Sequence, residues 1–426
     1  MKVKLYTLGC KVNQYETQEM TEDFIKHGFE VTLSDIEADV FVVNSCTVTA
    51  QSDKKTRQLV RRLKRKNENS IVVLTGCMPQ AFPELSGNLL QADIVIGNKN
   101  NTQIISKINE YLKNKSRVVD ISQHVSGEMF TGEPIKDFNE RTRAIIKIED
   151  GCDRFCSYCV IPIARGRVRS KPITDIKSEA EALAKAGYIE VVLVGINLSA
   201  YGKDTGESFA SAVAAACENE GIKRVRLGSL EPDHITDSVI SELSKLPKLC
   251  PQFHISLQSG CDKTLKRMNR HYTADEYFEL CNKLRKAFPD CTLTTDVMVG
   301  FAGETEQDFD DTVAFVRKVG FEKVHIFPYS VREGTRAAEF DGQVEKSVKE
   351  KRVALLMELT DKIRAEFLSA QVGKTVEIIP ETKQGSYIFG YTANYTPVLV
   401  KNKALEFGSL VKVKIISADS EYCYAE

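Results

Sequence analysis

Three short segments near the N-terminus share one design, and this repetition constrains the fold more than any other feature of the chain. Val3–Cys10, Asp39–Cys46 and Ile71–Cys77 are each a β-branched, apolar run that ends in a small or polar residue followed by cysteine. Helical stretches such as Thr17–His27 separate them, and this alternation predicts a parallel sheet. Ligands of open α/β sheets gather beyond the carboxyl ends of the strands. The three thiols are therefore expected to converge on one edge of the sheet.

A further cysteine-containing stretch is compact. Gly151–Cys159 carries Cys152, Cys156 and Cys159 at the spacing C-x3-C-x2-C. A loop this short can aim three thiolates at one iron–sulfur cluster, and such clusters are held by cysteine ligands. Three ligands leave one iron open to a small molecule. The alternatives are three unrelated buried thiols or a zinc site, but structural zinc takes four ligands and no histidine follows nearby.

The strand-end thiols Cys10, Cys46 and Cys77 favour a second three-cysteine cluster by their shared position, with zinc or structural thiols as the alternatives. One such cysteine alone would be interpreted as a buried core thiol. The other cysteines show no regular spacing, and we predict that they are structural: Cys217, Cys250, Cys261, Cys281, Cys291 and Cys423.

Composition limits the classes of protein that the chain can belong to. With 426 residues, 42% hydrophobic and 27% charged, it is typical of a globular protein of two to four domains. No apolar run approaches the roughly 18 residues of a membrane span, and the N-terminal apolar run is too short for a signal peptide. We therefore expect a cytoplasmic protein without membrane contact, in which twelve cysteines point to metal or catalytic roles because disulfides are rare there.

The pattern of periodicity predicts an α/β protein of three units. Residues 1–114 are expected to form an open parallel α/β sheet, residues 141–371 a partial barrel and residues 372–426 a small β-barrel. Residues 115–140 lose periodicity and contain glycine and proline, which indicates a linker.

The second unit alternates strands and helices and ends in a long helix over Val344–Gln371. Six βα units are too few for a closed eight-stranded barrel, so an open, partial (βα)6 barrel is expected. The compact cysteine loop follows the first strand and therefore lies at the carboxyl-end face, where barrel active sites are built. The strand candidates are Arg143–Ile148, Glu190–Val194, Val225–Leu227, Phe253–Leu257, Thr292–Val299 and Val324–Phe327.

The last unit alternates apolar and polar residues between turns, which is typical of a small β-barrel. Some of its aromatic side chains could stack on bases, but six lysines are balanced by six acids, so charge signals RNA binding only weakly. Its strand candidates are Lys374–Ile379, Tyr387–Tyr391, Pro397–Val400 and Leu410–Ile416.

A basic helix is predicted over Asp53–Asn67, which carries eight lysines and arginines against one acid. Leu59, Val60 and Leu63 supply only a narrow apolar stripe, so the basic face is exposed. Such a face is either simply solvated or binds a phosphate backbone; since the net charge is −1, nucleic-acid binding must come from patches of this kind. The candidate RNA contacts are Lys54, Arg57, Arg61, Arg62 and Arg65, together with Arg165 and Arg167 beside the compact loop.

These motifs resemble the methylthiotransferases of the radical S-adenosylmethionine (SAM) superfamily along the whole chain. That family has an N-terminal three-cysteine domain, a partial barrel with a C-x3-C-x2-C loop and a C-terminal β-barrel called TRAM. The matching segments are Thr7–Thr17, Asn44–Thr49, Thr75–Pro79 and Asp150–Gly166.

Within the family, Gly9-Cys-Lys-Val-Asn13 is most similar to bacterial enzymes that convert N6-threonylcarbamoyladenosine (t6A), next to the tRNA anticodon, into its 2-methylthio form. Relatives acting on isopentenyladenosine typically have Gly-Cys-Gln-Met-Asn, and those acting on a ribosomal protein have Gly-Cys-Pro-Lys-Asn. These two substrates are the alternatives within the family. A non-catalytic iron–sulfur protein that binds RNA or relays electrons is the alternative outside it, although an electron relay has no need of an open iron.

The resemblance implies two 4Fe-4S clusters, each held by one set of three thiols, with SAM on the open iron at Cys152, Cys156 and Cys159. Reductive cleavage of SAM gives a 5′-deoxyadenosyl radical, which is needed because the C2–H of adenine is not appreciably acidic. The cluster at Cys10, Cys46 and Cys77 would carry the sulfur. The implied partners are a tRNA anticodon stem-loop, a low-potential electron donor of the flavodoxin or ferredoxin type, and a sulfur source.

Candidate SAM contacts follow the barrel strands. Asn197 stands where many radical-SAM enzymes have glutamate, and glycines in the later turn allow a ligand to approach the backbone closely. Ordinary βα-turn or packing roles are the alternative for each of them. The candidates are Tyr158, Asn197, Ser256, Gln258, Gly300, Gly303 and Glu304.

Overall fold

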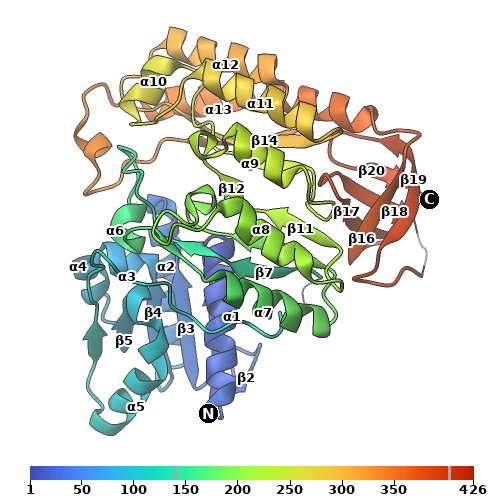
Figure 1. Cartoon of the computed structure of the whole chain (residues 1–426). Helices are drawn as coiled ribbons and strands as arrows, with labels where there is room; N and C mark the ends of the chain where they lie inside the picture. Colours follow the sequence, from blue (N-terminus) through green and yellow to red (C-terminus); the bar gives the residue numbers. More distant parts are fainter. Residues whose placement is uncertain (139–141, 402–403) are drawn as a thin grey trace.

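The N-terminal sheet consists of six parallel strands in the order β2-β1-β3-β4-β5-β6 (Figure 1). The computed structural model describes residues 1–138, 142–401 and 404–426. The strands are β1 (Lys2–Thr7), β2 (Glu30–Val31), β3 (Val40–Ser45), β4 (Ile71–Gly76), β5 (Ile94–Ile96) and β6 (Val118–Asp120). The helices are α1 (Lys11–Lys26), α2 (Ala50–Lys66), α3 (Cys77–Ala81), α4 (Pro83–Gly87) and α5 (Ile104–Asn114).

The predicted parallel sheet is confirmed, but the sheet extends further than expected. Its sixth strand, β6, lies inside residues 115–140 and pairs with β5, so the predicted linker begins too early. A strand of three residues has too few positions for periodicity to reveal it. Residues 139–140 of the predicted linker, and residue 141 at the predicted start of the next unit, lie outside the described residues.

The central unit is a parallel barrel in two parts, β11-β10-β7 and β12-β13-β14-β15. β7 and β15 are end strands of these sheets, as expected of an open, partial barrel. The parts separate at Gly228, between β11 and β12. The strands are β7 (Ala144–Lys147), β10 (Glu190–Val194), β11 (Arg224–Leu227), β12 (Ser229–Leu230), β13 (Gln252–Ile255), β14 (Thr292–Val299) and β15 (Lys323–Pro328).

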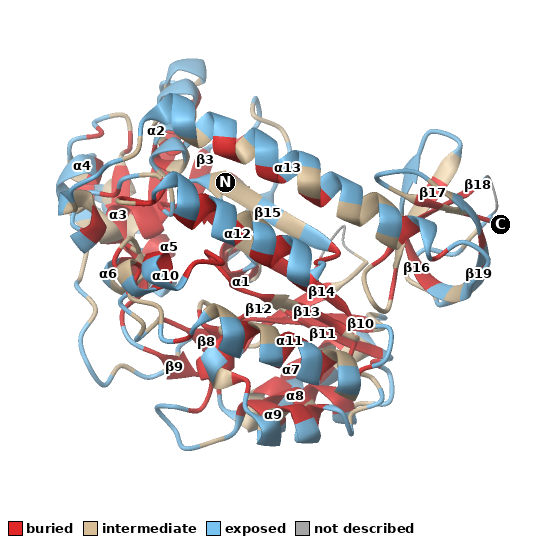
Figure 2. Cartoon of the chain, turned by 90° about the horizontal axis from the view of Figure 1, so that it is seen from above, coloured by how far each residue is buried: buried red, intermediate tan, exposed pale blue. Residues whose placement is uncertain are grey.

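Helices cover the outside of these strands, and one large apolar core lies between the two layers (Figure 2). The compact cysteine loop lies between β8 (Glu149–Asp150) and α6 (Ile161–Arg165), and β9 (Arg169–Ser170) pairs with β8. The remaining helices are α7 (Ile173–Lys185), α8 (Phe209–Glu218), α9 (Asp237–Leu243), α10 (Asp262–Arg267), α11 (Ala274–Ala287), α12 (Glu306–Val319) and α13 (Lys346–Ser369).

The C-terminal unit is a closed five-stranded barrel, joined to the central unit by α13 (Figure 2). The strand candidates of the sequence are confirmed, and a short last strand that they did not include pairs with both β18 and β19 to close the barrel. The strands are β16 (Thr375–Gln384), β17 (Tyr387–Thr392), β18 (Pro397–Lys401), β19 (Val411–Ala418) and β20 (Cys423–Ala425).

Buried polar contacts fix the outer units to the central one. On the N-terminal side, the Tyr15 hydroxyl of α1 donates to Glu179 of α7 at 2.9 Å. On the C-terminal side, Arg226 of β11 donates to the carbonyl oxygens of Thr392 and Ala393 at 3.2 and 2.9 Å. Both outer units therefore pack on the same partial barrel. Within the described residues, no helix combines the length and apolarity needed to cross a membrane.

Candidate active site

The strand-end thiols are gathered by the register of the sheet. β3 and β4 pair so that Ser45 lies opposite Gly76, which places Cys46 and Cys77 at adjacent strand ends. Gly76 has φ +95°, and a Cβ on it would lie 2.5 Å from the backbone nitrogen of Ser45. A Cβ on Gly9, just before Cys10, would lie 2.8 Å from the Cβ of Cys46. The close approach of the three turns therefore depends on glycine.

Asn13 fixes the position of Cys10. Its Oδ1 accepts a hydrogen bond from the Cys10 thiol at 3.3 Å, and its Nδ2 donates to the Ser45 carbonyl oxygen at 3.0 Å. The Asn44 side chain donates back to the Asn13 carbonyl oxygen at 3.0 Å. Asn13 is fully buried and thus ties the start of α1 to the end of β3. Asn13 is part of the Gly9–Asn13 motif, but the sequence analysis did not predict that it contacts Cys10.

Burial dominates the electrostatics of the strand-end thiols, and each thiol also lies within range of the charge of the others. Burial raises the pKa of Cys77 to about 12 against the opposing charge of Arg165, and Cys46 and Cys10 raise it further. Burial raises the pKa of Cys46 as well, with a smaller contribution from Cys10. Buried thiols of this kind ionise when a metal stabilises their thiolates. In the described part of the chain, no three His, Cys, Asp or Glu side chains surround a single metal ion.

The compact loop is held by backbone contacts to distant segments. The Cys152 N–H donates to the Gly166 carbonyl oxygen at 3.0 Å, and the Ser157 N–H donates to that of Met268 at 2.9 Å. Gly151 has φ +90°, and a Cβ there would lie 2.5 Å from the carbonyl carbon of Arg167. The loop that carries the three thiols is therefore pinned at both ends.

The thiols of the compact loop also lie close to one another. Burial raises the pKa of Cys159 to about 12, and Cys156 adds to this effect. Burial also raises the pKa of Cys152, and the neighbouring Cys159 and Cys156 thiols raise it further by smaller amounts. The Arg270 guanidinium donates to the Cys156 sulfur at 3.3 Å. The loop thus presents three neighbouring sulfurs beside a cation, which suits a cluster bound by thiolates.

Buried polar atoms without partners lie where a SAM molecule is expected. Asn197 follows β10, and its Nδ2 lies 3.7 Å from the Cys152 sulfur. Its Oδ1 is buried and has no hydrogen-bond partner within the described residues, and the same is true of Oε1 of Gln258. Unsatisfied buried acceptors are rare in folded proteins. These residues therefore fit a ligand with hydrogen-bond donors, such as the amino group of SAM.

The other candidate SAM contacts have different surroundings. Ser256 is buried, and its carbonyl oxygen accepts a hydrogen bond from the Tyr272 hydroxyl at 2.8 Å. The Tyr158 ring packs edge-on against Phe301 at 6.1 Å between ring centres. Both residues remain candidates, and Tyr158 has a packing contact as well.

The turn after β14 is tied to its own surroundings. The Gly300 N–H donates to the carboxylate of Glu304, and Arg352 of α13 donates to the same carboxylate at 2.8 Å. The Gly303 N–H donates to the carbonyl oxygen of Gly342 at 2.8 Å. Glu304 therefore pairs with a buried arginine through one carboxylate oxygen. Its other oxygen, Oε1, is buried and has no hydrogen-bond partner within the described residues, so Glu304 stays a candidate SAM contact.

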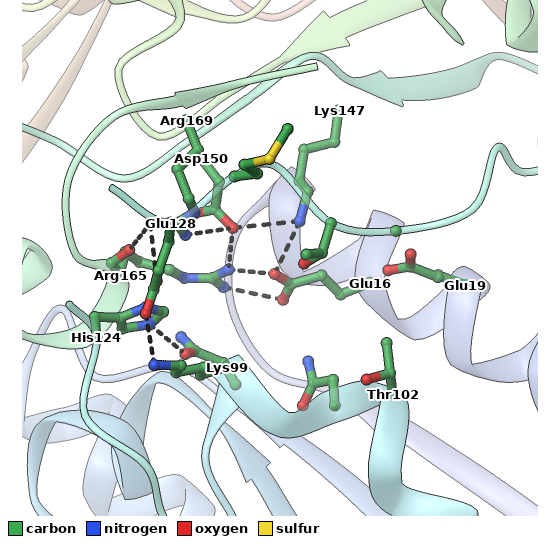
Figure 3. Close-up of a pocket in the computed structure, with 15 residues that line it drawn as sticks. Glu16, Glu19, Lys99, Thr102, His124, Glu128, Lys147, Asp150, Arg165 and Arg169 are labelled. Carbon is green, nitrogen blue, oxygen red and sulfur yellow. Dashed lines mark hydrogen bonds and ion pairs between the residues drawn. The ribbon is translucent and has the colours of Figure 1, made fainter. Parts of the chain in front are cut away.

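Arg165 links the two sets of thiols. It ends α6, just after the compact loop, and is only 1% exposed. Its Nε donates to the sulfur of Cys77 at 3.2 Å, and its Nη2 donates to Glu16 of α1 at 3.0 Å. Asp150, just before the loop, and Lys147 complete the network shown in Figure 3. The prediction that Arg165 contacts RNA is wrong, because its guanidinium is buried and paired.

The remaining candidate RNA contacts are accessible. Arg167 is exposed and lies over the Phe155 ring at 4.5 Å. On α2, the predicted basic face is confirmed, and Arg61, Arg62 and Arg65 are exposed and form no ion pair among the described residues. The other two candidates on this helix are the exposed Lys54 and the half-buried Arg57.

A cavity of about 790 Å³, here called the central cavity, lies where the three units meet. Cys10 and Lys11 of the N-terminal unit, Arg226 of the barrel, and Tyr391 and Tyr395 of the C-terminal unit contribute to its wall. One strand-end thiol therefore lines a space that is large enough for a nucleoside and that also reaches the barrel interior.

Family descriptions and solved structures identify the class of this protein. The Radical SAM superfamily matches residues 146–316, and the Uncharacterized protein family UPF0004 matches residues 2–97. The solved structure of the radical S-adenosylmethionine methyltransferase TsrM from Kitasatospora setae superposes with a TM-score of 0.56 at 14% identity, covering 77% of this chain and 72% of its own. The fold is therefore that of a radical SAM protein.

Full-length relatives define the family within that class. The chain is 39% identical, over 99% of its length, to threonylcarbamoyladenosine tRNA methylthiotransferase MtaB of Bacillus subtilis, of which it covers 95%. It is also 39% identical to the protein of that name from Thermotoga maritima, covering 98% of this chain and 95% of the relative. A tRNA-2-methylthio-N(6)-dimethylallyladenosine synthase of Clostridium botulinum is 35% identical, with coverages of 97% and 94%.

The chain belongs to the radical SAM methylthiotransferase family, as its cysteine motifs predicted. It is therefore an enzyme that uses SAM and two 4Fe-4S clusters.

Proposed function

We propose that the protein is a tRNA methylthiotransferase that converts t6A, 3′ to the anticodon, into 2-methylthio-t6A. The observation that carries this proposal is the full-length identity of 39% with two proteins named for threonylcarbamoyladenosine. The central cavity supports it, because a strand-end thiol and the barrel interior share one space there. A tRNA substrate also agrees with the cytoplasmic location expected for this protein.

The two sets of thiols take different parts of the reaction. Cys152, Cys156 and Cys159 would hold the SAM-binding cluster, and the strand-end thiols would hold the cluster that carries sulfur. When bound, these groups supply the one-electron and sulfur-transfer chemistry that side chains lack. The chain itself contributes geometry, because it holds both sets in fixed positions at one junction between domains.

Individual side chains would orient the reactants. The unpaired Oδ1 of Asn197 and Oε1 of Gln258 would accept hydrogen bonds from SAM. Arg270 and Arg165 donate to cysteine sulfurs, so they would balance part of the negative charge of cluster-bound thiolates. Tyr158, Ser256, Gly300, Gly303 and Glu304 stay as further candidates for lining the SAM site.

Binding of the anticodon stem-loop would use cations of α2, namely the exposed Lys54, Arg61, Arg62 and Arg65 and the half-buried Arg57, together with Arg167. A low-potential donor of the flavodoxin or ferredoxin type would supply electrons, and a separate donor would supply the sulfur. These partners follow from the chemistry, since each turnover consumes electrons and one sulfur atom.

Mass spectrometry of tRNA nucleosides tests the proposed function. Purified protein with reconstituted clusters, SAM, reductant and sulfide should convert t6A in a stem-loop to its 2-methylthio form. Stem-loops with isopentenyladenosine are the matched comparison, because the Clostridium botulinum relative is nearly as similar. If only the isopentenyladenosine stem-loop gave product, isopentenyladenosine would replace t6A as the proposed substrate. Absence of 5′-deoxyadenosine would contradict radical SAM chemistry altogether.

A further inference from the structure

The central cavity contains a lysine that forms no ion pair with any described residue. Lys11 is the first residue of α1, follows Cys10 directly and lines the cavity wall. Lys11 is an exposed residue. In the described part of the chain, its ammonium group has no hydrogen bond or ion pair. An unpaired cation in the wall of a binding cavity is available for an anionic ligand.

The other cations in the wall differ from Lys11 in one of two ways. Arg226 pairs with Glu190 at 3.0 Å, and Arg364 pairs with Glu322 at 2.7 Å, so their charges are already balanced. Lys323 has no hydrogen bond or ion pair with a described residue, but it begins β15 and so lies at the amino end of a strand. The cysteine loop and Asn197 follow carboxyl ends of strands, on the opposite side of the barrel.

The chemistry of the proposed substrate calls for a cation near the transferred sulfur. In t6A, threonine is attached through its amino group, so its carboxylate is free and ionised at neutral pH. C2, which receives the sulfur, and C6, which bears the N6 substituent, both flank N1 on the same edge of the base. A base placed with C2 toward Cys10 therefore directs its N6 substituent to the wall beside Cys10, where Lys11 lies.

We propose that Lys11 binds the threonyl carboxylate of t6A and thereby selects the anionic substrate over neutral N6-modified adenosines. This inference rests on the proposed function and specifies the contact that gives it specificity. A charge-assisted hydrogen bond of this kind is directional, and losing it leaves the carboxylate desolvated without a partner. Lys11 would be a specificity-determining residue and take no part in C–S bond formation.

A binding experiment with two ligands and three variants tests this contact. The ligands are anticodon stem-loops that carry t6A or its methyl ester, which removes the charge and changes little else. Wild-type holoenzyme should bind the acid roughly ten- to a hundredfold more tightly than the ester, as expected for one charged hydrogen bond. Lys11→Gln should lose this preference, whereas Lys11→Arg should keep most of it. Lys323→Gln is the matched control and should keep it fully.

The outcomes separate the two proposals. Equal affinity of the wild-type protein for acid and ester would overturn the role of Lys11, and so would a preference that survives in Lys11→Gln. Iron content and circular dichroism establish that each variant is folded and loaded. Methylthiolation of t6A by the wild type tests the proposed function separately, because it depends on the product and not on the acid-to-ester ratio.

Discussion

The two sets of cysteines reach a similar arrangement by opposite routes. The compact set lies within Cys152–Cys159, so its short spacing keeps the thiols together, while hydrogen bonds to Gly166 and Met268 hold the loop in place. The strand-end set comes from three βα units, and the register of β1, β3 and β4 brings its members together. A local loop can be recognised by its spacing alone. A distributed site exists only once the sheet has formed, so it is more sensitive to changes elsewhere in the fold.

Arg165 connects the segment that follows the compact loop to the strand-end set. It belongs to the segment after the compact loop, but it donates to Cys77 and pairs with Glu16 near Cys10. Burial alone would lower its pKa, but Cys77, Glu16 and Asp150 outweigh burial and hold the pKa well above its usual range. The difference between the local and the distributed site can therefore be tested by substitutions in each set of cysteines and at Arg165.

The largest effect is expected from removing either set of thiols. Replacing Cys152, Cys156 and Cys159 by Ala should abolish 5′-deoxyadenosine formation and lower iron from roughly eight to about four atoms per chain. Replacing Cys10, Cys46 and Cys77 should lower iron equally but preserve SAM cleavage. Iron analysis and chromatography of the cleavage products measure both quantities. Full iron content in the second variant would refute a cluster at the strand ends.

Loss of the connection at Arg165 should have the next largest effect. Arg165→Gln leaves Glu16 and Asp150 buried with less compensation, so the free energy of unfolding should fall by about 3–5 kcal/mol. Arg167→Gln, two residues away and exposed, is the control and should change it by less than about 0.5 kcal/mol. Chemical denaturation measures both. If the two variants were equally stable, the buried network would contribute nothing to domain docking.

Substitution of Gly76 should affect the distributed site alone. Gly76→Ala adds a Cβ that collides with Ser45 in a backbone of positive φ, so it should displace Cys77 and reduce iron by about half. The control Gly28→Ala has φ +82° and nothing within 4 Å of the added Cβ. It should cost only the backbone strain of about 1–2 kcal/mol and leave iron unchanged.

Full iron in Gly76→Ala would show that the sheet edge can relax around a methyl group. Retention of SAM cleavage in the same variant is also expected, since the compact loop lies on a different unit.

The smallest effect is expected at the basic face of α2, outside both sets. Changing Arg61, Arg62 and Arg65 to Gln should weaken stem-loop binding and reduce the slope of log affinity against log salt by up to about 0.7–0.9 per lost phosphate contact. Lys185→Gln is the control, because its ammonium pairs with Glu181 on α7. Filter binding over a salt series measures the slope. An unchanged slope would show that the basic face of α2 is simply solvated and does not bind RNA.

The sequence by itself determined the features that have local causes. Strand–helix alternation predicted the parallel sheet and the partial barrel, because side-chain periodicity follows backbone geometry. The spacing within Cys152–Cys159 indicated three ligands, because a short loop keeps neighbouring thiols together. The position of Cys10, Cys46 and Cys77 after three strands predicted their convergence, because parallel strands end at one edge.

Tertiary structure alone decided which polar groups are paired. Arg165 looked like a surface cation beside a cluster loop, but folding buries it against Glu16, a residue far away in the chain. Glu304 looked like a turn residue free for a ligand, but Arg352 of α13 pairs with one of its two carboxylate oxygens. Lys11, conversely, lines the central cavity and forms no ion pair with any residue that the structure describes. Pairing of charges depends on contacts between distant segments, and no local pattern in a sequence encodes those contacts.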